Sequence, residues 1–317
     1  MKKSRSRAQE RRFWGKIFTF PSFIVVCLFA FYPVFRTLYL SFCEYNFGFD
    51  ASPVFIGVEN YVRMFSDSKF LLALENTASY AVIDFILMLV LSLAIALLLF
   101  FKGKHTWFFR TAVFTPIVVP ISLTCILFSW MLSGSFGIVN QFLSNTLGMP
   151  QLAHGWLTDE KTAMIWIVIV SVWNRVGFPT ILFLSGLQNI SEDILEAAEI
   201  DGATGFRKIF RVILPNLRET YVVVGMWIIM QALKVFVEPM VLTAGGPHNS
   251  TLVLYQYIYN TAFSYWDMGY ASAMAFVLSG LTCTLMGEAS LSMRRNASAS
   301  LVPKSDTSFF TSHCGWL

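Results

Sequence analysis

Residues 196–215 read EAAEIDGATGFRKIFRVILP, a charged stretch broken by glycine that lies between two long apolar runs. Just before it, Ser191 can cap a helix whose first turn carries Glu192 and Asp193, and acidic side chains at that end complement the helix dipole. Gly202 is expected to stop this helix, because glycine commonly follows a helix C-terminus. The pattern therefore predicts a short helix followed by a turn.

The second half of the stretch has apolar residues at helical spacing, with the basic residues on other sides. The apolar residues are Phe206, Ile209, Phe210 and Ile213, and the basic residues are Arg207, Lys208 and Arg211. This spacing predicts a second, amphipathic helix that ends at Pro215. We expect a helix, turn, helix element at a membrane surface, and an amphipathic helix that touches only lipid headgroups is the alternative.

The composition is that of an integral membrane protein. Of the 317 residues 56% are hydrophobic and only 13% are charged, and the mean hydropathy is +0.60, which indicates several membrane spans. The formal net charge of +4 is too small to indicate nucleic acid as a partner.

The sequence carries no pattern typical of catalysis or of metal binding. Its five cysteines and four histidines are scattered, so they indicate neither a disulfide framework nor a metal site. There is no G-x-x-x-x-G-K-[ST] loop, and the chain therefore cannot hydrolyse ATP in the P-loop manner. We expect no catalytic residue, metal ion or cofactor on this chain, and a partner must bring the ATPase if ATP drives it.

Six apolar runs predict an all-α membrane domain over residues 18–290, between a basic N-terminus at 1–17 and a tail at 291–317. The runs lie at about 18–42, 77–101, 111–132, 163–187, 221–242 and 271–287. The first is much longer than the ~7–15 residues of a signal-peptide core, so it is interpreted as a span. At 1.5 Å per residue five runs can cross a hydrocarbon core of about 30 Å, and the last is marginal.

The basic residues outside these spans lie mainly on one side. Seventeen of the 23 Lys and Arg residues fall in the N-terminus, at 102–110, at 207–218 and in the tail, against three in the opposite loops. Such an excess marks the cytoplasmic side. Both termini are therefore expected in the cytoplasm, and the loops 133–162 and 243–270 are expected outside as structured caps.

The order Glu-Ala-Ala, three residues, Gly, nine residues, Val-x-Leu-Pro resembles the EAA signature of the permease subunits of bacterial ABC importers; Val212 stands where that family more often has Ile. The resemblance implies six spans and a coupling loop at 188–220 that docks on a cytoplasmic ATPase and transmits its closing motion. The residues that it implies in this contact are Glu196, Ala197, Ala198, Asp201, Gly202, Ala203, Leu214 and Pro215.

Further motifs are similar to the carbohydrate-uptake branch, the relatives of the maltose and glycerol-3-phosphate permeases. They are Phe55–Tyr61 (FIGVENY), Asn76-Thr77, Trp173 with Gly177-Phe178-Pro179, Gly186-Leu187-Gln188, and Thr243–Pro247 (TAGGP) with Thr251. The similarity implies the bacterial cell membrane as the location. It also implies a second permease subunit in a heterodimer, an ATPase dimer that binds ATP and Mg²⁺, an external solute-binding protein and a carbohydrate substrate.

Polar side chains within the spans are candidates for the substrate path, because a charge inside a bilayer costs ~2.5–3.5 kcal/mol and usually faces a cavity or a partner. Trp227, Gln231, Lys234 and Glu238 are spaced i, i+4, i+7, i+11 and are expected along one helical face. Trp173, Asn174 and Arg175 are expected near the midplane. Indole, amide and charged groups together suit a sugar.

Each of these residues also has a structural alternative. Lys234 and Glu238 can pair with each other or with the partner subunit, Asn174 and Arg175 can bond to carbonyls of a neighbouring helix, and Asp84 is expected to be structural. Because Arg175 and Lys234 are basic, glycerol 3-phosphate or another anionic solute is the alternative substrate.

An ion-driven carrier and a membrane enzyme are the alternative classes of function. An ion-driven secondary carrier or channel would need internal repeats or discontinuous helices around an ion site, and the chain has no self-similar halves. A membrane enzyme would need a catalytic grouping, and none stands out. The tail departs from the family pattern, because Ser279, Gly280, Gly287 and Glu288 interrupt the sixth run, which indicates either divergence or a frameshift near Ser279.

Overall fold

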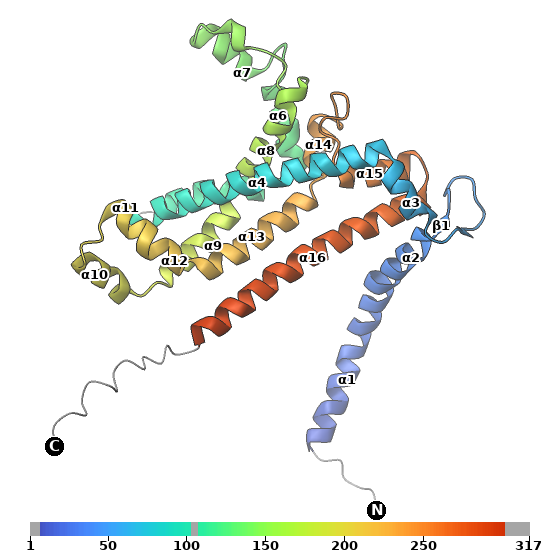
Figure 1. The fold of residues 1–317 in the computed structure, drawn as a ribbon, viewed down its shortest axis with the longest axis horizontal. Coiled ribbons are helices and arrows are strands. Elements are labelled where there is room, and N and C mark those ends of the chain that lie inside the picture. Colours follow the sequence, from blue (N-terminus) through green and yellow to red (C-terminus); the bar gives the residue numbers. More distant parts are fainter. Residues whose placement is uncertain (1–6, 103–106, 302–317) are drawn as a thin grey trace, which may run out of the picture. The chain divides into compact units, whose positions relative to one another are not determined.

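The fold is seen in a computed structural model that describes residues 7–102 and 107–301 (Figure 1). This part of the chain is mostly helical, which confirms the predicted all-α membrane class. A short antiparallel hairpin accompanies the helices, in which Cys43 of β1 (Cys43–Glu44) lies opposite Phe55 of β2 (Val54–Phe55). The predicted N-terminal segment 1–17 and tail 291–317 fall partly outside the described residues.

Within the residues that the structure describes, three helical segments are long and apolar enough to cross a membrane. The first, Trp14–Ser41, joins α1 (Arg7–Val26) to α2 (Tyr32–Ser41) through a π-helical turn at Cys27–Phe31. The second is α4 (Ser68–Phe101), and the third is the part Met268–Glu288 of α16 (Met268–Leu301). The sixth predicted run thus lies in one continuous helix, which the polar and small residues around Ser279 and Gly280 do not break.

Three further segments are bent pairs of helices. The angle is 94° between α5 (Trp107–Val118) and α6 (Ile121–Met131), and 52° between α8 (Glu160–Arg175) and α9 (Gly177–Gln188). It is 72° between the segment Gly205–Asn216 and α13 (Arg218–Leu233). Counting each bent pair as one span gives up to six spans, by length and composition, in the described part of the chain.

The fifth predicted run, 221–242, is not one helix. Helix α13 ends at Leu233, and three residues separate it from α14 (Val237–Leu242), which has Pro239 in its first turn. Proline has no N–H, and its ring clashes with the carbonyl four residues earlier, so a helix that includes Pro239 cannot extend unbroken back through Val235. The expectation of a continuous helical face over this run is wrong.

Shorter helices connect these segments. They are α3 (Glu59–Ser66), α7 (Ile138–Gln141), α10 (Glu192–Ile200), α11 (Gly205–Lys208), α12 (Leu214–Asn216) and α15 (Leu254–Tyr259).

The chain divides into two compact units, each with its own packing. The first comprises Met1–Tyr80, Cys125–Ile167 and Lys234–Gly280, and its core joins side chains of α3, the start of α4, α15 and α16, among them Met64, Phe70 and Met274.

The second unit comprises Ala81–Thr124, Val168–Leu233 and Leu281–Leu317, and in it α9 packs against α5 and α13. Gly177 permits this approach, because a Cβ at that position would lie 2.5 Å from the carbonyl oxygen of Val113 on α5. On the other side of α9, the Phe183 ring meets Tyr221 of α13 edge to face, with ring centroids 5.2 Å apart.

Candidate functional site

The 196–215 segment has the predicted short helix and turn. Helix α10 ends at Ile200, and Gly202 follows with a φ of +78°, a left-handed conformation that side chains with a Cβ rarely adopt. The predicted stop at Gly202 is therefore confirmed. The predicted cap is wrong in one respect: Ser191 precedes α10 with extended backbone, but its side chain makes no capping hydrogen bond.

The second helix of the segment is present, but it does not have a single apolar face. It consists of α11, a π-helical turn at Ile209–Ile213 and α12. A π-helical turn bonds residue i to residue i+5 and so contains an extra residue. The apolar side chains after it therefore no longer lie on the same side of the helix as those before it. Phe206 is 80% exposed and Phe210 is also exposed, whereas Ile213 is fully buried. The predicted amphipathic pattern is thus only partly correct.

The outer surface of this segment combines exposed acidic and apolar side chains. Of the residues implied by the EAA resemblance, Glu196, Ala197, Asp201, Gly202 and Pro215 are exposed, Ala203 and Leu214 are half-buried and Ala198 is buried.

Sequence reasoning missed Ile200, which is 87% exposed in the acidic helix α10. It also missed the ion pair across the turn, in which Lys208 Nζ lies 2.7 Å from Glu199 Oε1. Exposed apolar groups such as Ile200 and Phe206 on one short element are typical of a surface that another molecule covers.

A cavity of about 520 Å³ lies beside this turn, between the segment and the end of α4. Phe100 and Phe101 of α4 line one side, and Thr204, Phe206 and Ile209 line another.

The ionisable residues predicted at membrane depth in the second unit form a buried pair. Asp84 of α4 is fully buried, and its Oδ1 lies 3.5 Å from Nη2 of Arg175, the last residue of α8. Arg175 also donates to the hydroxyl of Ser171, one turn earlier. Pairing offsets part of the cost of removing both charges from water.

Asn174 is almost fully buried, and its amide bonds to the break between α5 and α6. Its Nδ2 donates to the carbonyl oxygens of Pro116, at 2.9 Å, and Val119, at 3.3 Å. It also lies 3.3 Å from the hydroxyl oxygen of Thr124. Pro120 cannot donate the helical bond to Pro116, since proline has no N–H. The neighbouring Trp173 is exposed.

The four polar residues of the fifth run are not brought onto one helix. Trp227 is half-buried against Phe178, with ring centroids 4.9 Å apart, and Gln231 is also half-buried on α13. Lys234 is exposed beyond the end of α13, and Glu238 is buried in the first turn of α14. Lys234 and Glu238 therefore do not form the expected pair within one helix, and their place in a substrate path stays a prediction.

The motif residues of the first unit hold the loop that follows α14. Asn76 Nδ2 of α4 donates to the carbonyl oxygens of Asn249, at 2.9 Å, and Leu252, at 3.0 Å. The next residue, Thr77, accepts a bond from the backbone N–H of Leu254 at 2.8 Å. Within the loop the hydroxyls of Thr243 and Thr251 are 2.7 Å apart. The sequence indicated these residues only as motifs, and their shared role is to fix this loop.

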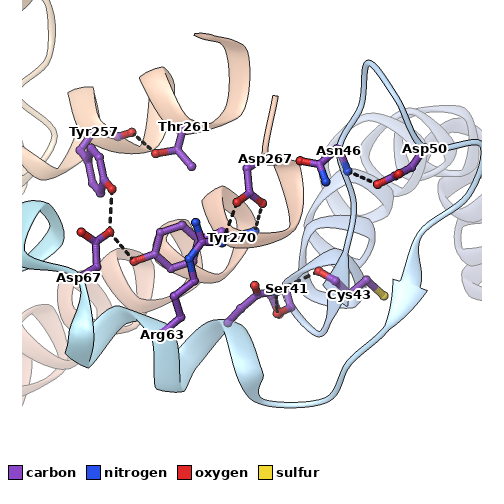
Figure 2. Close-up of polar contacts among 11 residues, drawn as sticks. Ser41, Cys43, Asn46, Asp50, Arg63, Asp67, Tyr257, Thr261, Asp267 and Tyr270 are labelled. Atoms are coloured by element: carbon purple, nitrogen blue, oxygen red, sulfur yellow. Dashed lines mark hydrogen bonds and ion pairs between the residues drawn. The ribbon is translucent and has the colours of Figure 1, made fainter. Parts of the chain in front are cut away.

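A second polar cluster of the same unit joins α3 and the start of α4 to α15 and α16 (Figure 2). Asp67 accepts hydrogen bonds from the hydroxyls of Tyr257, at 2.6 Å, and Tyr270, at 2.8 Å. Arg63 Nη1 lies 2.8 Å from Asp267 Oδ2, and its guanidinium lies over the Tyr270 ring.

This cluster shifts the titration of its acidic and phenolic groups. Burial alone would raise the pKa of Asp67, but the bonds from the two tyrosines and from backbone N–H groups outweigh it, so the pKa is lowered. The pKa of Tyr257 is raised, first by burial and then by its bond to Asp67.

The chain is similar to a known protein family and to known transport proteins. Residues 69–290 match the family model of the binding-protein-dependent transport system inner membrane component. The probable ABC transporter permease protein YurN of Bacillus subtilis is 36% identical over 264 residues, which cover 83% of this chain and 90% of that protein.

Two relatives are named for their solutes. The lactose transport system permease protein LacF of Rhizobium radiobacter is 33% identical, over 86% of this chain and 92% of its own. The sulfoquinovosyl glycerol transport system permease protein SmoG of Agrobacterium fabrum is 33% identical, over 83% and 84%.

A solved structure has the same fold. The bacterial alginate ABC transporter, in complex with an alginate pentasaccharide-bound periplasmic protein, contains a chain that matches with a TM-score of 0.76. The match covers 90% of this chain and 96% of that chain at 22% identity.

Proposed function

We infer the function of this chain from its family: it belongs to the binding-protein-dependent transport system inner membrane components. It is a membrane-embedded permease subunit of a carbohydrate ABC importer and not an enzyme. The observation that carries the mechanism is the 196–215 segment, in which a helix, a left-handed glycine and a second helix carry exposed Glu196, Ile200 and Phe206.

The transport complex contains, in our proposal, this chain, a second permease subunit and two copies of a cytoplasmic ATPase. ATP and Mg²⁺ bind to the ATPase, since this chain has no P-loop. A solute-binding protein delivers the carbohydrate from outside. The excess of basic residues supports cytoplasmic termini and a cytoplasmic 196–215 segment.

Motion of the ATPase is transmitted through the 196–215 segment. When ATP closes the ATPase dimer, α10 moves with it, and the turn at Gly202 and the Lys208–Glu199 ion pair connect that motion to α11 and so to α13. The bundle then opens outward to receive the solute, and it releases the solute inside after hydrolysis. Binding energy at this surface drives the change only because the two states differ in their contacts with the ATPase.

The substrate is, in our proposal, a sugar or oligosaccharide. The names of relatives support it, because they include a lactose and a sulfoquinovosyl glycerol permease. The proposed path residues remain Trp173, Asn174, Arg175, Trp227, Gln231, Lys234 and Glu238. A phosphorylated or anionic solute is the alternative that Arg175 and Lys234 allow.

Reconstitution of the complete complex tests this function. Uptake into proteoliposomes should require ATP, the ATPase and the binding protein together. Glu196→Lys should reduce both ATPase binding and uptake, whereas Glu192→Lys, a control at another exposed position of the same helix, should retain both. Uptake by this chain alone would contradict the ATP-driven mechanism, and normal uptake by the Glu196→Lys variant would contradict the assigned contact.

A further inference from the structure

A cavity of about 310 Å³ lies in the first unit, beside α15 and α16. Its lining comes from α15, from the π-helical turn that follows it at Asn260–Ser264, and from α16. Ala262 and Leu278 are its buried lining residues. The exposed lining includes three aromatic rings, those of Tyr255, Tyr259 and Phe263. An apolar cavity of this size with a few polar groups is a candidate site for a small molecule.

The rings of this cavity form a continuous row with Phe236, the residue before α14. The Phe236 ring centroid lies 5.5 Å from that of Tyr255 and 5.1 Å from that of Tyr259. The Tyr259 centroid lies 5.1 Å from that of Phe263. Tyr255, Tyr259 and Phe263 are 42%, 38% and 58% exposed, so the row presents ring surface at the cavity. We name these four residues the aromatic row.

The two tyrosines of the aromatic row have hydroxyls that the fold does not use. Tyr257 lies between them on α15 and is buried, and its hydroxyl donates to Asp67 at 2.6 Å (Figure 2). In the described part of the chain, neither the Tyr255 nor the Tyr259 hydroxyl has a hydrogen-bond partner. Each therefore has one free donor and a free acceptor at the cavity.

These groups suit a carbohydrate better than they suit a lipid tail. A sugar ring has an apolar face, which can pack on an aromatic ring, and hydroxyls, which can bond to a phenol oxygen. A lipid tail would bury the phenol oxygens of Tyr255 and Tyr259 without a partner, which costs free energy. The lining of the cavity contains no charged residue, so a neutral sugar fits it better than a phosphorylated solute.

The aromatic row adjoins two residues of the proposed substrate path. Phe236 follows Lys234 by two residues and precedes Glu238 by two, in the stretch between α13 and α14. Lys234 is exposed, and its ammonium group can donate to a sugar hydroxyl. In the proposed orientation the segment 243–270 is on the outer side, so the row lies where a solute enters from outside.

We propose that the cavity beside the aromatic row is a carbohydrate subsite of this permease. A sugar ring stacks on Tyr259 and Tyr255, and the two phenol hydroxyls bond to hydroxyls of the sugar. The inference rests on the proposed import of carbohydrate and adds to it a site outside the path residues named above. The second permease subunit and lipid are the competing occupants of the cavity.

Fluorine NMR of the complete importer tests the subsite directly. One 3-fluorotyrosine replaces Tyr255, and the complex, without its binding protein, is titrated with lactose, maltose, raffinose or glycerol 3-phosphate in its nucleotide-free and ATP-trapped states. The same label at Tyr265, which is 58% exposed and outside the cavity, is the control. We expect at least one of the three sugars to shift the signal at 255, with no shift at 265 and none from glycerol 3-phosphate.

Variants of the neighbouring tyrosine then measure its contribution to binding. With the label at 255, Tyr259→Leu should raise the Kd of the sugar about 2- to 10-fold, since it removes one ring contact and one hydroxyl. Tyr259→Phe, which keeps the ring, should raise the Kd less and provides the measurement if Tyr259→Leu does not fold. Tyr265→Leu removes a similarly exposed tyrosine and should leave the Kd unchanged.

Four results would overturn the proposal. They are no sugar-dependent shift at 255 in either state, an equal shift at 265, a Kd that neither Tyr259 variant changes, and a shift from glycerol 3-phosphate alone. Loss of the second permease subunit from the purified Tyr259→Phe complex would likewise reject it, because the row would then be a subunit contact. The titration requires no uptake, so an importer that fails to transport these sugars with ATP would reject the proposed function and leave this test intact.

Discussion

Replacing Asn174 with leucine should destabilise the protein and leave its preference among solutes unchanged. The substitution keeps the size of this buried side chain but removes the amide that donates to the carbonyl oxygens of Pro116 and Val119. Those carbonyls lie at the 94° break between α5 and α6. The sequence analysis also named Asn174 as a candidate for the substrate path. The variant therefore distinguishes a structural role at the helix break from a role in substrate contact.

The size of the effect follows from the three contacts of the amide. A typical intramolecular hydrogen bond contributes about 0.5–1.5 kcal/mol net, and bonds between membrane helices average about 0.6 kcal/mol. Pro116 still accepts a bond from the N–H of Val119 at 3.1 Å, so it is not left without a donor. We therefore expect a total loss of about 1–3 kcal/mol.

The measurement is thermal and denaturant unfolding of the purified complex, together with uptake kinetics. Asn189→Leu, at an exposed position just after α9, is the control and should unfold like the parent. A double-mutant cycle with Thr124→Val should show coupling, because the Asn174 amide lies 3.3 Å from the Thr124 hydroxyl. Unchanged stability with an altered KM for the sugar would refute the structural role and favour a contact with substrate.

Three further predictions concern other positions. Gly177→Ala should cost about 1–3 kcal/mol of stability through overpacking, because its Cβ would lie 2.5 Å from a backbone oxygen of α5. Gly280→Ala, where the added Cβ has no heavy atom within 4 Å, should keep the stability of the parent or raise it by up to about 1 kcal/mol, because alanine favours a helix interior. Gly202→Val should lower the solute moved per ATP hydrolysed, since its φ of +78° costs a β-branched residue about 1–2 kcal/mol. Gly202→Asn should retain more coupling, and equal coupling in both variants would show that this conformation is not needed. Asp67 has a lowered pKa in the folded protein, so its carboxylate adds stability that is present above the unfolded value of 3.8 and is lost as the pH falls through the folded pKa. The melting temperature should therefore fall more steeply below pH 5 in the parent than in Asp67→Asn, and identical pH profiles would contradict this.

Much of the fold could be predicted from the sequence because the apolar length of a span and the position of a turn depend only on short stretches of residues. The apolar runs mark where helices are long enough to cross a membrane, and Gly202 marks the turn between two short helices, as the structure has it. The side-chain register after that turn could not be predicted in the same way. The π-helical turn at Ile209–Ile213 separates Phe206 from Ile213, and a count at 3.6 residues per turn does not detect it.

The helix breaks are marked in the sequence by prolines, which a hydropathy count does not take into account. Pro120 lies between α5 and α6, Pro179 lies in the first turn of α9, and Pro239 lies in the first turn of α14. Each proline sits inside a run that is apolar enough to be taken as one span. Counting backbone donors along each run, in addition to apolar side chains, would have placed the breaks near these prolines.

Helix breaks also change how a polar residue within a span should be interpreted. A broken helix leaves carbonyl groups without their usual donors, and inside a bilayer water cannot replace those donors. Asn174 supplies its amide to one such break, so its polarity has a structural cause that no spacing within its own helix could indicate. Arg175, the next residue, is paired with Asp84. A polar side chain is therefore a stronger candidate for substrate contact where no break lies beside it. Gln231 is half-buried and lies only two residues before α13 ends, so its amide needs the same test for a structural role.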